Sequence, residues 1–338
     1  MAIDALKGNN SLMSQNDKKT KFKLIFNPRA GEKRGFLFRQ NSKFFLEQLR
    51  FLLEKYQIPV DFYPTKKAGH ATELAKDAIK EKYKGVLVVG GDGTVGEVAN
   101  GLIGSEMVLG ILPLGSFMNI ARMLSIPNDL DQAIMLIKIG RVRKIDAGKV
   151  TMLNGIELNP PYFFLESSSM GLEAQAHEYI HQIESGKGWS LIKMVKSFWD
   201  FYIYSSDIQI DDLIIHTKAS AIVVGNGSLS GPGLAMSLEA KLNDHLLTVS
   251  IYKMAKFELI RLAMNLLMGK KQLSRKIDVF QGRKITISNR FPRLVHADAR
   301  LFGKTPFKCQ VEPNALSIIT GFPEAGVEYL KKRTPLDP

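Results

Sequence analysis

The sequence predicts an α/β protein of two domains: an N-terminal doubly wound parallel sheet domain and a C-terminal, mainly antiparallel β domain with a helical insert. Its 338 residues are more than one hydrophobic core usually serves. The first 140 residues alternate apolar runs with helical patterns, as in a parallel sheet wound by helices. Closely spaced strand-like runs follow, and these indicate an antiparallel domain.

The N-terminal domain is expected over residues 21–140, after a polar lead-in at residues 1–20 that we expect to be disordered. Its strands are predicted from largely apolar runs, which are typical of strands buried on both faces. These runs occupy residues 22–26, 60–63, 85–89 and 108–112. Apolar residues recur with helical spacing at residues 36–55, 71–82 and 94–103.

The C-terminal domain is expected over residues 141–325. Gly, Pro and Asn separate its strand-like stretches, which is typical of antiparallel sheets. These stretches are residues 144–150, 162–166, 219–224, 246–252, 284–288 and 316–320. A helical insert is expected at roughly residues 172–204. A return of the chain to the first domain at the C-terminus is left open.

Composition limits the partners and the compartment. The formal net charge is +13, from 46 basic and 33 acidic residues. This surplus favours anionic partners such as nucleotides, nucleic acids or acidic lipids, and it equally serves solubility. Cys309 is the one cysteine, which excludes an internal disulfide. With no signal peptide and no apolar run of about 18 residues, we expect a cytoplasmic location.

A glycine-rich motif, Gly90-Gly-Asp-Gly-Thr94, stands between an apolar run and an amphipathic pattern. Glycines let the backbone turn sharply and approach a ligand closely. Thr94 and Glu97 have the spacing of a capping box, so a helix is predicted to start at Thr94. The free N–H groups of such a terminus favour anions. The alternative is an ordinary Asp-Gly turn between two elements.

Two further glycine-bearing loops follow predicted strands, at Asn27-Pro-Arg-Ala-Gly31 and at Gly115-Ser116. In an open parallel sheet, the loops at the carboxyl ends of the strands line one crevice. We therefore expect the three loops to converge. Arg29, Lys33 and Arg34 would then supply positive charge beside a triphosphate.

Together these motifs resemble the diacylglycerol kinase catalytic-domain family, which includes bacterial lipid kinases and sphingosine kinases. The resemblance runs from about residue 21 to residue 321. In the first domain it is carried by residues 27–31, 65, 69–71, 90–101, 112–116 and 121–122. In the second domain it is carried by residues 171–174, 243–247, 295–298 and 312–316.

The resemblance implies ATP bound between the two domains with Mg²⁺, and transfer of its γ-phosphoryl group to a hydroxyl of diacylglycerol or a related lipid alcohol. Asp92 would order metal and water near the phosphates, Asp244 would belong to a structural Mg²⁺ site, and Asp298 would receive the hydroxyl proton. The nucleotide site would comprise Asn27, Arg29, Gly31, Thr65, Gly90, Gly91, Asp92, Gly93, Thr94, Glu97, Gly115 and Ser116. Phosphoryl transfer needs positioning and charge neutralisation, which N–H groups, carboxylate-held Mg²⁺ and a nearby base provide.

Three departures from the family pattern bear on catalysis. Arg300 stands where the family has the Glu of an Asp-Gly-Glu motif, and an arginine cannot act as a base. Asp298 could then accept the proton in place of the glutamate, or Arg300 could bind a phosphate. The remaining alternative is a site with weakened or lost catalytic activity. The Gly-Thr-x-Asn motif reads Gly115-Ser-Phe-Met118, and Asp244 is followed by His245 in place of Gly. We favour catalysis.

A competing motif is His177-Glu-Tyr-Ile-His181, which matches the zinc-protease pattern. Helical spacing puts both histidines on one face, with Glu178 as the base. The longer form of the motif fails, because Glu184 and Lys187 stand where it has Gly and His. A solvated helix face is the favoured interpretation, and metal analysis would decide.

Residues 188–203 are rich in aromatic side chains, with Lys193 and Lys196 among them. They predict either an interfacial helix that contacts an anionic membrane at its inner face, or core packing of the β domain. Nucleic-acid binding is not expected, because no recognition helix, finger or RNA-binding aromatic pair occurs. A homodimer is left open.

Three functional hypotheses follow. The first is an ATP-dependent lipid kinase. The second is a catalytically weakened lipid- or nucleotide-binding protein on the same fold, suggested by Arg300. The third is an NAD kinase, which shares the Gly-Gly-Asp-Gly-Thr motif but fits the blocks at Asn27 and Asp298 less well.

Overall fold

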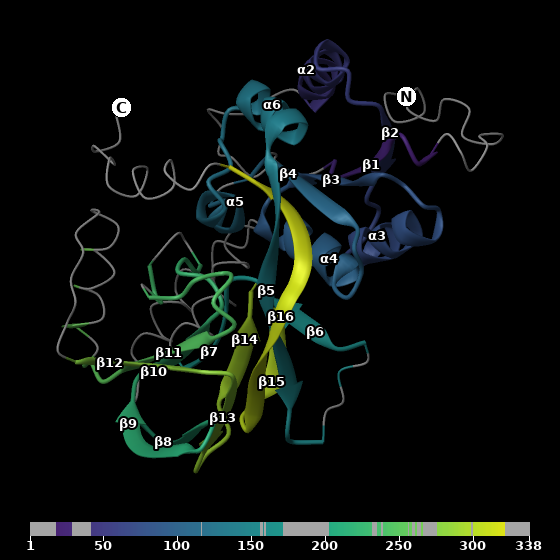
Figure 1. Ribbon diagram of the computed structural model, residues 1–338. Helices are drawn as coiled ribbons and strands as arrows, with labels where there is room; N and C mark the ends of the chain where they lie inside the picture. Colours follow the sequence, from purple (N-terminus) through teal and green to yellow (C-terminus); the bar gives the residue numbers. More distant parts are fainter. Residues whose placement is uncertain are drawn as a thin grey trace. The chain divides into compact units, whose positions relative to one another are not determined.

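The computed structural model divides the chain into two compact units (Figure 1). Unit 1 holds the described residues up to Ile145 and those from Ala315 onward, and unit 2 holds Asp146–Asn314. The structure describes residues 18–28, 42–115, 117–155, 158, 160–171, 203–231, 235–237, 239–255, 257–258, 261, 265, 276–298 and 300–321. Most of the predicted lead-in and almost all of the predicted helical insert therefore lie outside the described residues.

Unit 1 is built on a parallel sheet with the strand order β2-β1-β3-β4-β16. All of these neighbours pair in parallel. The strands of this sheet are β1 (Phe22–Phe26), β2 (Val60–Pro64), β3 (Gly85–Gly90), β4 (Val108–Pro113) and the end of β16 (Phe307–Thr320). The central strands β1 and β3 are buried along their whole length, which explains their apolar sequences. The predicted parallel α/β domain is confirmed.

Within the described residues of unit 1, five helices flank this sheet. They are α2 (Ser42–Lys55), α3 (His70–Lys80), α4 (Asp92–Leu102), α5 (Asn119–Met123) and α6 (Leu130–Ile139). Contacts join α3 to α4 and α2 to α6, and Figure 1 shows these pairs on opposite sides of the strands. The sheet is thus wound by helices on both faces, as the sequence predicts. The first six residues of the helix expected at 36–55 lie outside the described part.

Unit 2 contains two antiparallel sheets. One has the order β12-β11-β10-β7-β14-β15, and the other joins β9, β8 and β13 to the first half of β16. The six-stranded sheet comprises β7 (Ser167–Gly171), β10 (Ala221–Gly225), β11 (Leu247–Tyr252), β12 (Ile277–Gly282), β14 (Leu294–Ala297) and β15 (Arg300–Lys304). The other comprises β8 (Tyr204–Ile210), β9 (Leu213–Ala219), β13 (Lys284–Asn289) and β16, with β5 (Arg141–Met152) and β6 (Tyr162–Phe164) beside it. The predicted antiparallel domain is confirmed.

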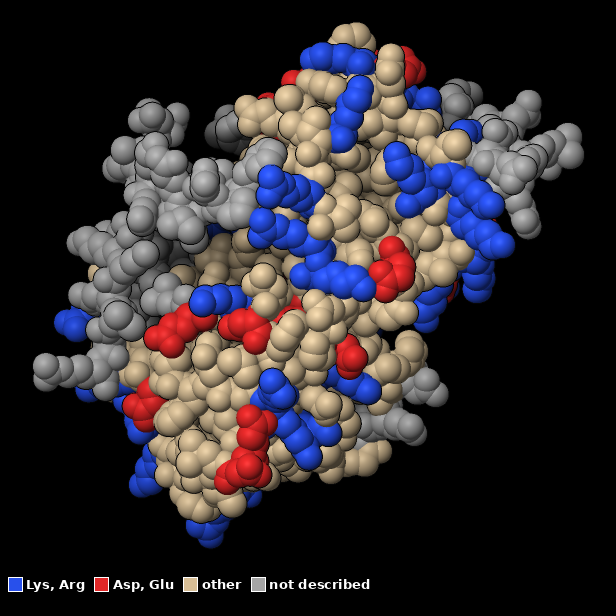
Figure 2. Space-filling model, in the orientation of Figure 1, with Lys and Arg blue, Asp and Glu red and all other residues tan. Residues whose placement is uncertain are grey.

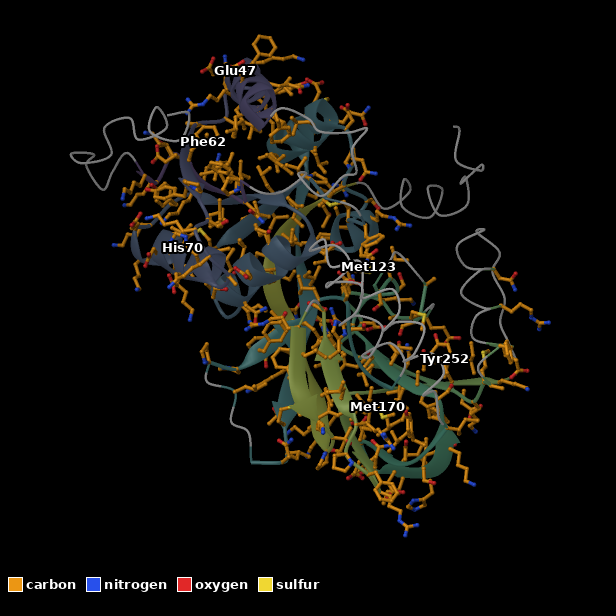
Figure 3. All side chains as sticks on the ribbon, turned by 180° about the vertical axis from the view of Figure 1, so that it is seen from behind. Glu47, Phe62, His70, Met123, Met170 and Tyr252 are labelled. Carbon is orange, nitrogen blue, oxygen red and sulfur yellow. The ribbon has the colours of Figure 1, made fainter. Side chains whose placement is uncertain are left out.

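The core of unit 2 lies between these sheets. Burial alternates along β8, so that Ile208 and Ile210 are buried while Gln209 between them is exposed. Met170 of β7, which is labelled in Figure 3, packs into the same cluster with Val224 and Phe307. This buried cluster includes residues of β6, β7 and β14, and Asp298 directly follows β14.

Candidate functional site

The glycine loop joins β3 to α4 in unit 1. Gly91 is the N-cap of α4, with an extended backbone at φ −82° and ψ 179°, and the helix begins at Asp92. The predicted start at Thr94 is therefore wrong by two residues. The Thr94 N–H donates to the Gly91 carbonyl at 2.9 Å, so Thr94 already lies in the first turn. The predicted capping box is also wrong, since Glu97 Oε1 instead accepts from the Gly69 N–H at 2.9 Å.

Glycines allow two of the predicted loops to touch. A Cβ on Gly115 would lie 2.8 Å from the Cα of Gly91, and a Cβ on Gly90 would lie 2.8 Å from the Cβ of Thr94. The Leu114 N–H also donates to the Gly90 carbonyl at 3.2 Å. The loops after β3 and β4 are thus in backbone contact, at a distance that only glycine permits.

Asp92 ties these loops to α5. Its carboxylate oxygens accept the N–H groups of Asn119 and Ile120, both at 3.0 Å. Burial raises the pKa of Asp92, although these backbone hydrogen bonds oppose the rise. Both oxygens are therefore used to hold the loop after β4 against the start of α4.

The other predicted nucleotide residues follow neighbouring strands. The Asn27 N–H donates to the Val89 carbonyl at 3.3 Å, directly after β1. The Thr65 N–H donates to the Phe26 carbonyl at 2.8 Å, directly after β2. The structure therefore brings Asn27, Thr65 and Gly90 to one edge of the parallel sheet. The predicted residues Arg29, Gly31, Lys33, Arg34 and Ser116 lie outside the described part.

The residues at this edge fit a polyphosphate. At Gly91 an added Cβ would make only ordinary contacts, 3.7 Å from the Cα of Gly115 and 3.9 Å from the Leu114 carbonyl oxygen. An eleven-residue helix begins at the next residue, and the first N–H groups of a helix, ahead of that of Thr94 here, have no acceptor one full turn earlier. Anionic phosphate oxygens satisfy these donors and interact favourably with the helix dipole.

Asp298, the predicted acceptor of the hydroxyl proton, lies in unit 2 just after β14. Its backbone is left-handed, with φ 45°. Its carboxylate accepts the N–H groups of Leu165 and Glu166 at 2.9 Å and of Ser167 at 3.2 Å, while its own N–H donates to the Ser167 carbonyl. Asp298 is therefore clamped to the turn between β6 and β7, and three donors stabilise its charged form.

The predicted metal residue Asp244 precedes β11. Its Oδ1 accepts the Leu246 N–H at 3.1 Å, an ordinary turn contact. Its neighbour His245 has a left-handed backbone with φ 61°, the conformation that a glycine in this place would favour. His245 points to the fully buried Asp146: its Nδ1 lies 2.9 Å from Oδ1, and its N–H donates to Oδ2 at 2.7 Å.

Sequence reasoning missed Asp146. Besides His245 it accepts the N–H of Asn314 at 2.8 Å, and its backbone carbonyl accepts from the Asn226 amide at 3.0 Å. Asp146 and Asn314 are the first and last residues of unit 2, so this carboxylate ties both strands by which the chain enters and leaves the unit. No local sequence pattern marks Asp146 as a buried acceptor, because its partners His245 and Asn314 lie 99 and 168 residues away in the sequence.

Comparisons with protein families account for both units. The diacylglycerol kinase catalytic domain matches residues 21–150, and the YegS C-terminal NAD kinase beta sandwich-like domain matches residues 166–320. Residues 21–150 belong to the diacylglycerol kinase catalytic-domain family, and a YegS-like C-terminal domain follows them. Kinases of this family use ATP.

Individual diacylglycerol kinases are similar to this chain, some over most of their length and one over its first part. The diacylglycerol kinase of Staphylococcus saprophyticus is 25% identical over 295 residues, which cover 84% of this chain and 90% of that protein. That of Staphylococcus carnosus is 34% identical over 130 residues, 38% of this chain and 40% of that protein. A crystal structure of a diacylglycerol kinase from Bacillus anthracis has a TM-score of 0.68 at 22% identity, with 90% of this chain and 98% of that chain covered. At this identity the likeness shows the fold.

Arg300, which replaces the glutamate of the diacylglycerol kinase pattern, lies beside two aromatic rings. Arg300 is exposed, and its guanidinium lies 5.3 Å from the ring centroid of Tyr162 and 5.9 Å from that of Phe302. Cation–π attraction favours this placement over the two rings. Ala299, which replaces the family's Gly, lies outside the described residues.

Asp244, which the family resemblance implies as a ligand of a structural Mg²⁺ ion, does not stand in a cluster of side-chain ligands among the described residues. Mg²⁺ prefers several oxygen ligands in octahedral geometry. Within the described part of the chain, no group of three or more His, Cys, Asp or Glu side chains is placed to hold a metal. The nearby buried carboxylate, Asp146, is already occupied by donors of the chain itself.

Two other sequence motifs cannot be placed. The predicted zinc pattern at residues 177–181 lies outside the described residues, as does the aromatic stretch 188–203 apart from Ile203. No helix in the described part of this diacylglycerol kinase family member is long and apolar enough to cross a membrane.

Proposed function

We propose that this protein is an ATP-dependent lipid kinase, which transfers the γ-phosphoryl group of ATP to a hydroxyl of diacylglycerol or a related lipid alcohol. The observation that carries the proposal is the match of residues 21–150 to the diacylglycerol kinase catalytic domain, which is followed by a YegS-like C-terminal domain at residues 166–320. The geometry of the glycine loop and of Asp298 supplies the parts that this chemistry needs.

In the proposal, the backbone of unit 1 holds the phosphates. The first N–H groups of α4 and the backbone at Gly91 receive phosphate oxygens, and Thr65 and Asn27 lie at the same edge of the sheet. Asp92 acts by fixing the two loops through its hydrogen bonds to the start of α5. ATP with bound Mg²⁺ would supply the transferable phosphoryl group and neutralise part of its charge.

Asp298 orients the acceptor hydroxyl. Three amide donors hold its carboxylate in one position, where it can accept a hydrogen bond from the hydroxyl and then its proton. A weak base is sufficient, because the transition state for phosphoryl transfer is loose and the proton leaves late. Arg300, held over Tyr162, carries no proton-accepting group.

The test is transfer of label from [γ-³²P]ATP to a panel of lipid alcohols and to NAD. Label in a lipid supports the proposal. We expect Asp298→Asn to lower kcat by about 10²–10³-fold, as for loss of a general base, and to leave the KM for ATP nearly unchanged. An equally active Asp298→Asn variant contradicts the role given to Asp298.

A catalytically weakened binding protein is the second candidate, and the observation that favours it is the stacking of Arg300 on aromatic rings where the family has a carboxylate. Tight ATP binding by calorimetry, with no label in any acceptor, would select it. Label in NAD would select the NAD kinase alternative. A yeast NADH kinase shares the fold at 10% identity and a TM-score of 0.50.

A further inference from the structure

Exposed apolar side chains gather with cations at one end of the β8, β9 and β13 strands in unit 2. The exposed fractions of Ile203 and Phe291 are 48% and 63%. Arg290 and Lys218 are exposed beside them, and Arg293 is partly exposed. We call these five residues the β13–β14 surface. Large apolar side chains that stay in water next to cations are typical of an interaction site.

The fold brings the three stretches that carry these residues together at one end of the strands. The Asn289 amide donates to Ser206 Oγ at 2.7 Å, which anchors the end of β13 to the start of β8. The guanidinium of Arg293 lies 3.9 Å from the ring centroid of Tyr204. Lys218 lies one position along β9 from the register partner of Tyr204. The surface is therefore assembled by the fold from three separate stretches.

Charge distinguishes this surface from other exposed apolar residues. No residue is acidic in residues 203–206, 218–220 and 289–293, and the carboxylate next to them on β8, Asp207, lies against His216. At the other end of the β8–β9 hairpin, Ile214 is 61% exposed but Asp211 and Asp212 stand beside it. Figure 2 shows lysine and arginine side chains spread over the face drawn, with acidic side chains among them. Net charge alone therefore does not locate a docking surface, whereas the local pattern does.

We propose that the β13–β14 surface docks on an anionic lipid surface. Phe291 and Ile203 insert at the level of the headgroups, while Lys218, Arg290 and Arg293 contact lipid phosphates. Apolar insertion combined with cationic contacts is the pattern of proteins that bind at the membrane interface. The inference takes from the proposed function only that the acceptor is a membrane lipid. The short strand β14 then leads from the docked Arg293 to Asp298.

Vesicle co-sedimentation without ATP tests the docking. We expect binding to vesicles with about 30% phosphatidylglycerol, weak binding to phosphatidylcholine alone, and loss at high salt. Phe291→Ser and Arg290→Glu should each weaken binding about fivefold or more. Ile214→Ser is the matched apolar control, and Lys80→Glu, on a lysine with 76% of its side chain exposed, is the matched charge control. Both controls should bind as the wild type does.

Three results would overturn the inference: no binding of the wild type to anionic vesicles, unchanged binding of both variants, or loss of binding by the controls as well. Equal binding of wild type to single-stranded DNA, lost in the same variants, would identify a general polyanion site instead. Kinase assays separate this inference from the proposed function. The docking variants should phosphorylate a short-chain acceptor in detergent at the wild-type rate. If the wild type transfers no phosphoryl group to any acceptor, the proposed function fails, and vesicle binding still tests the docking surface.

Discussion

Removal of the His245 imidazole should destabilise unit 2, and removal of metal should not. The imidazole lies 2.9 Å from the carboxylate of Asp146, which has no exposed surface. His245→Leu takes one charge-assisted partner from a buried acceptor, which costs about 2 kcal/mol of unfolding free energy. For a unit of this size, that loss corresponds to a fall in Tm of about 4–8 °C. Chelation of divalent ions by EDTA should leave the Tm of the wild type unchanged.

The chain offers a matched control on its surface. His216 Nδ1 lies 2.7 Å from Asp207 Oδ1, but 76% and 64% of these two side chains are exposed. Exposed pairs contribute little, so His216→Leu should lower Tm by less than about 2 °C. His245→Gly should cost about 1 kcal/mol less than His245→Leu, because glycine relieves the left-handed backbone.

Differential scanning calorimetry with and without EDTA and Mg²⁺ measures all of these shifts. Equal Tm values for His245→Leu and His216→Leu would refute the structural role of the buried pair. A fall in the wild-type Tm on chelation, reversed by Mg²⁺, would show that a metal ion holds this loop after all.

Three further predictions concern single residues. Because burial raises the pKa of Asp92, the folded state holds its proton more tightly than the unfolded state. The unfolding free energy of wild type relative to Asp92→Asn should therefore fall as pH rises from about 4 and level off above the raised pKa, as urea titrations would show. Gly115→Ala places a Cβ 2.8 Å from the Cα of Gly91 and should push the two loops apart, so the KM for ATP should rise about tenfold or more. At Gly91 an added Cβ would come no closer than 3.7 Å to another atom, so Gly91→Ala should leave the Tm nearly unchanged. Burial raises the pKa of Cys309 to about 12, so a thiol reagent at neutral pH should label it only after unfolding.

The parallel sheet of unit 1 could be predicted because its signal is local. Each strand is a short apolar run with a turn at its end, and buried parallel strands need nothing else. Helix α6 was missed although its start is visible, since Asp129 accepts the Gln132 N–H at 2.9 Å as an N-cap does. Strands β14 and β15 were missed for a different reason: they have four and five residues and contain His, Arg and Lys.

The candidate site was predicted in part. The loops at the ends of β1, β3 and β4 could be assigned to one edge, because the carboxyl ends of parallel strands lie at the same edge of a sheet. The roles of the carboxylates could not be assigned, because their partners are backbone groups from distant stretches. Asp298 binds amides more than 130 residues away, and Glu97 binds an amide that precedes α3. Residue spacing carries no information on such contacts.

The two candidate carboxylates share a mode of action that bears on the departure at Arg300. Asp92 and Asp298 each direct both oxygens to backbone N–H groups, so each carboxylate shapes a loop. A site built in this way depends on positioned backbone more than on a strong base, which is what loose phosphoryl transfer requires. Loss of the family glutamate should then reduce the rate without abolishing it. Arg300→Glu, which restores that carboxylate, should raise kcat severalfold in a kinase, whereas a silent binding protein should gain no activity from it.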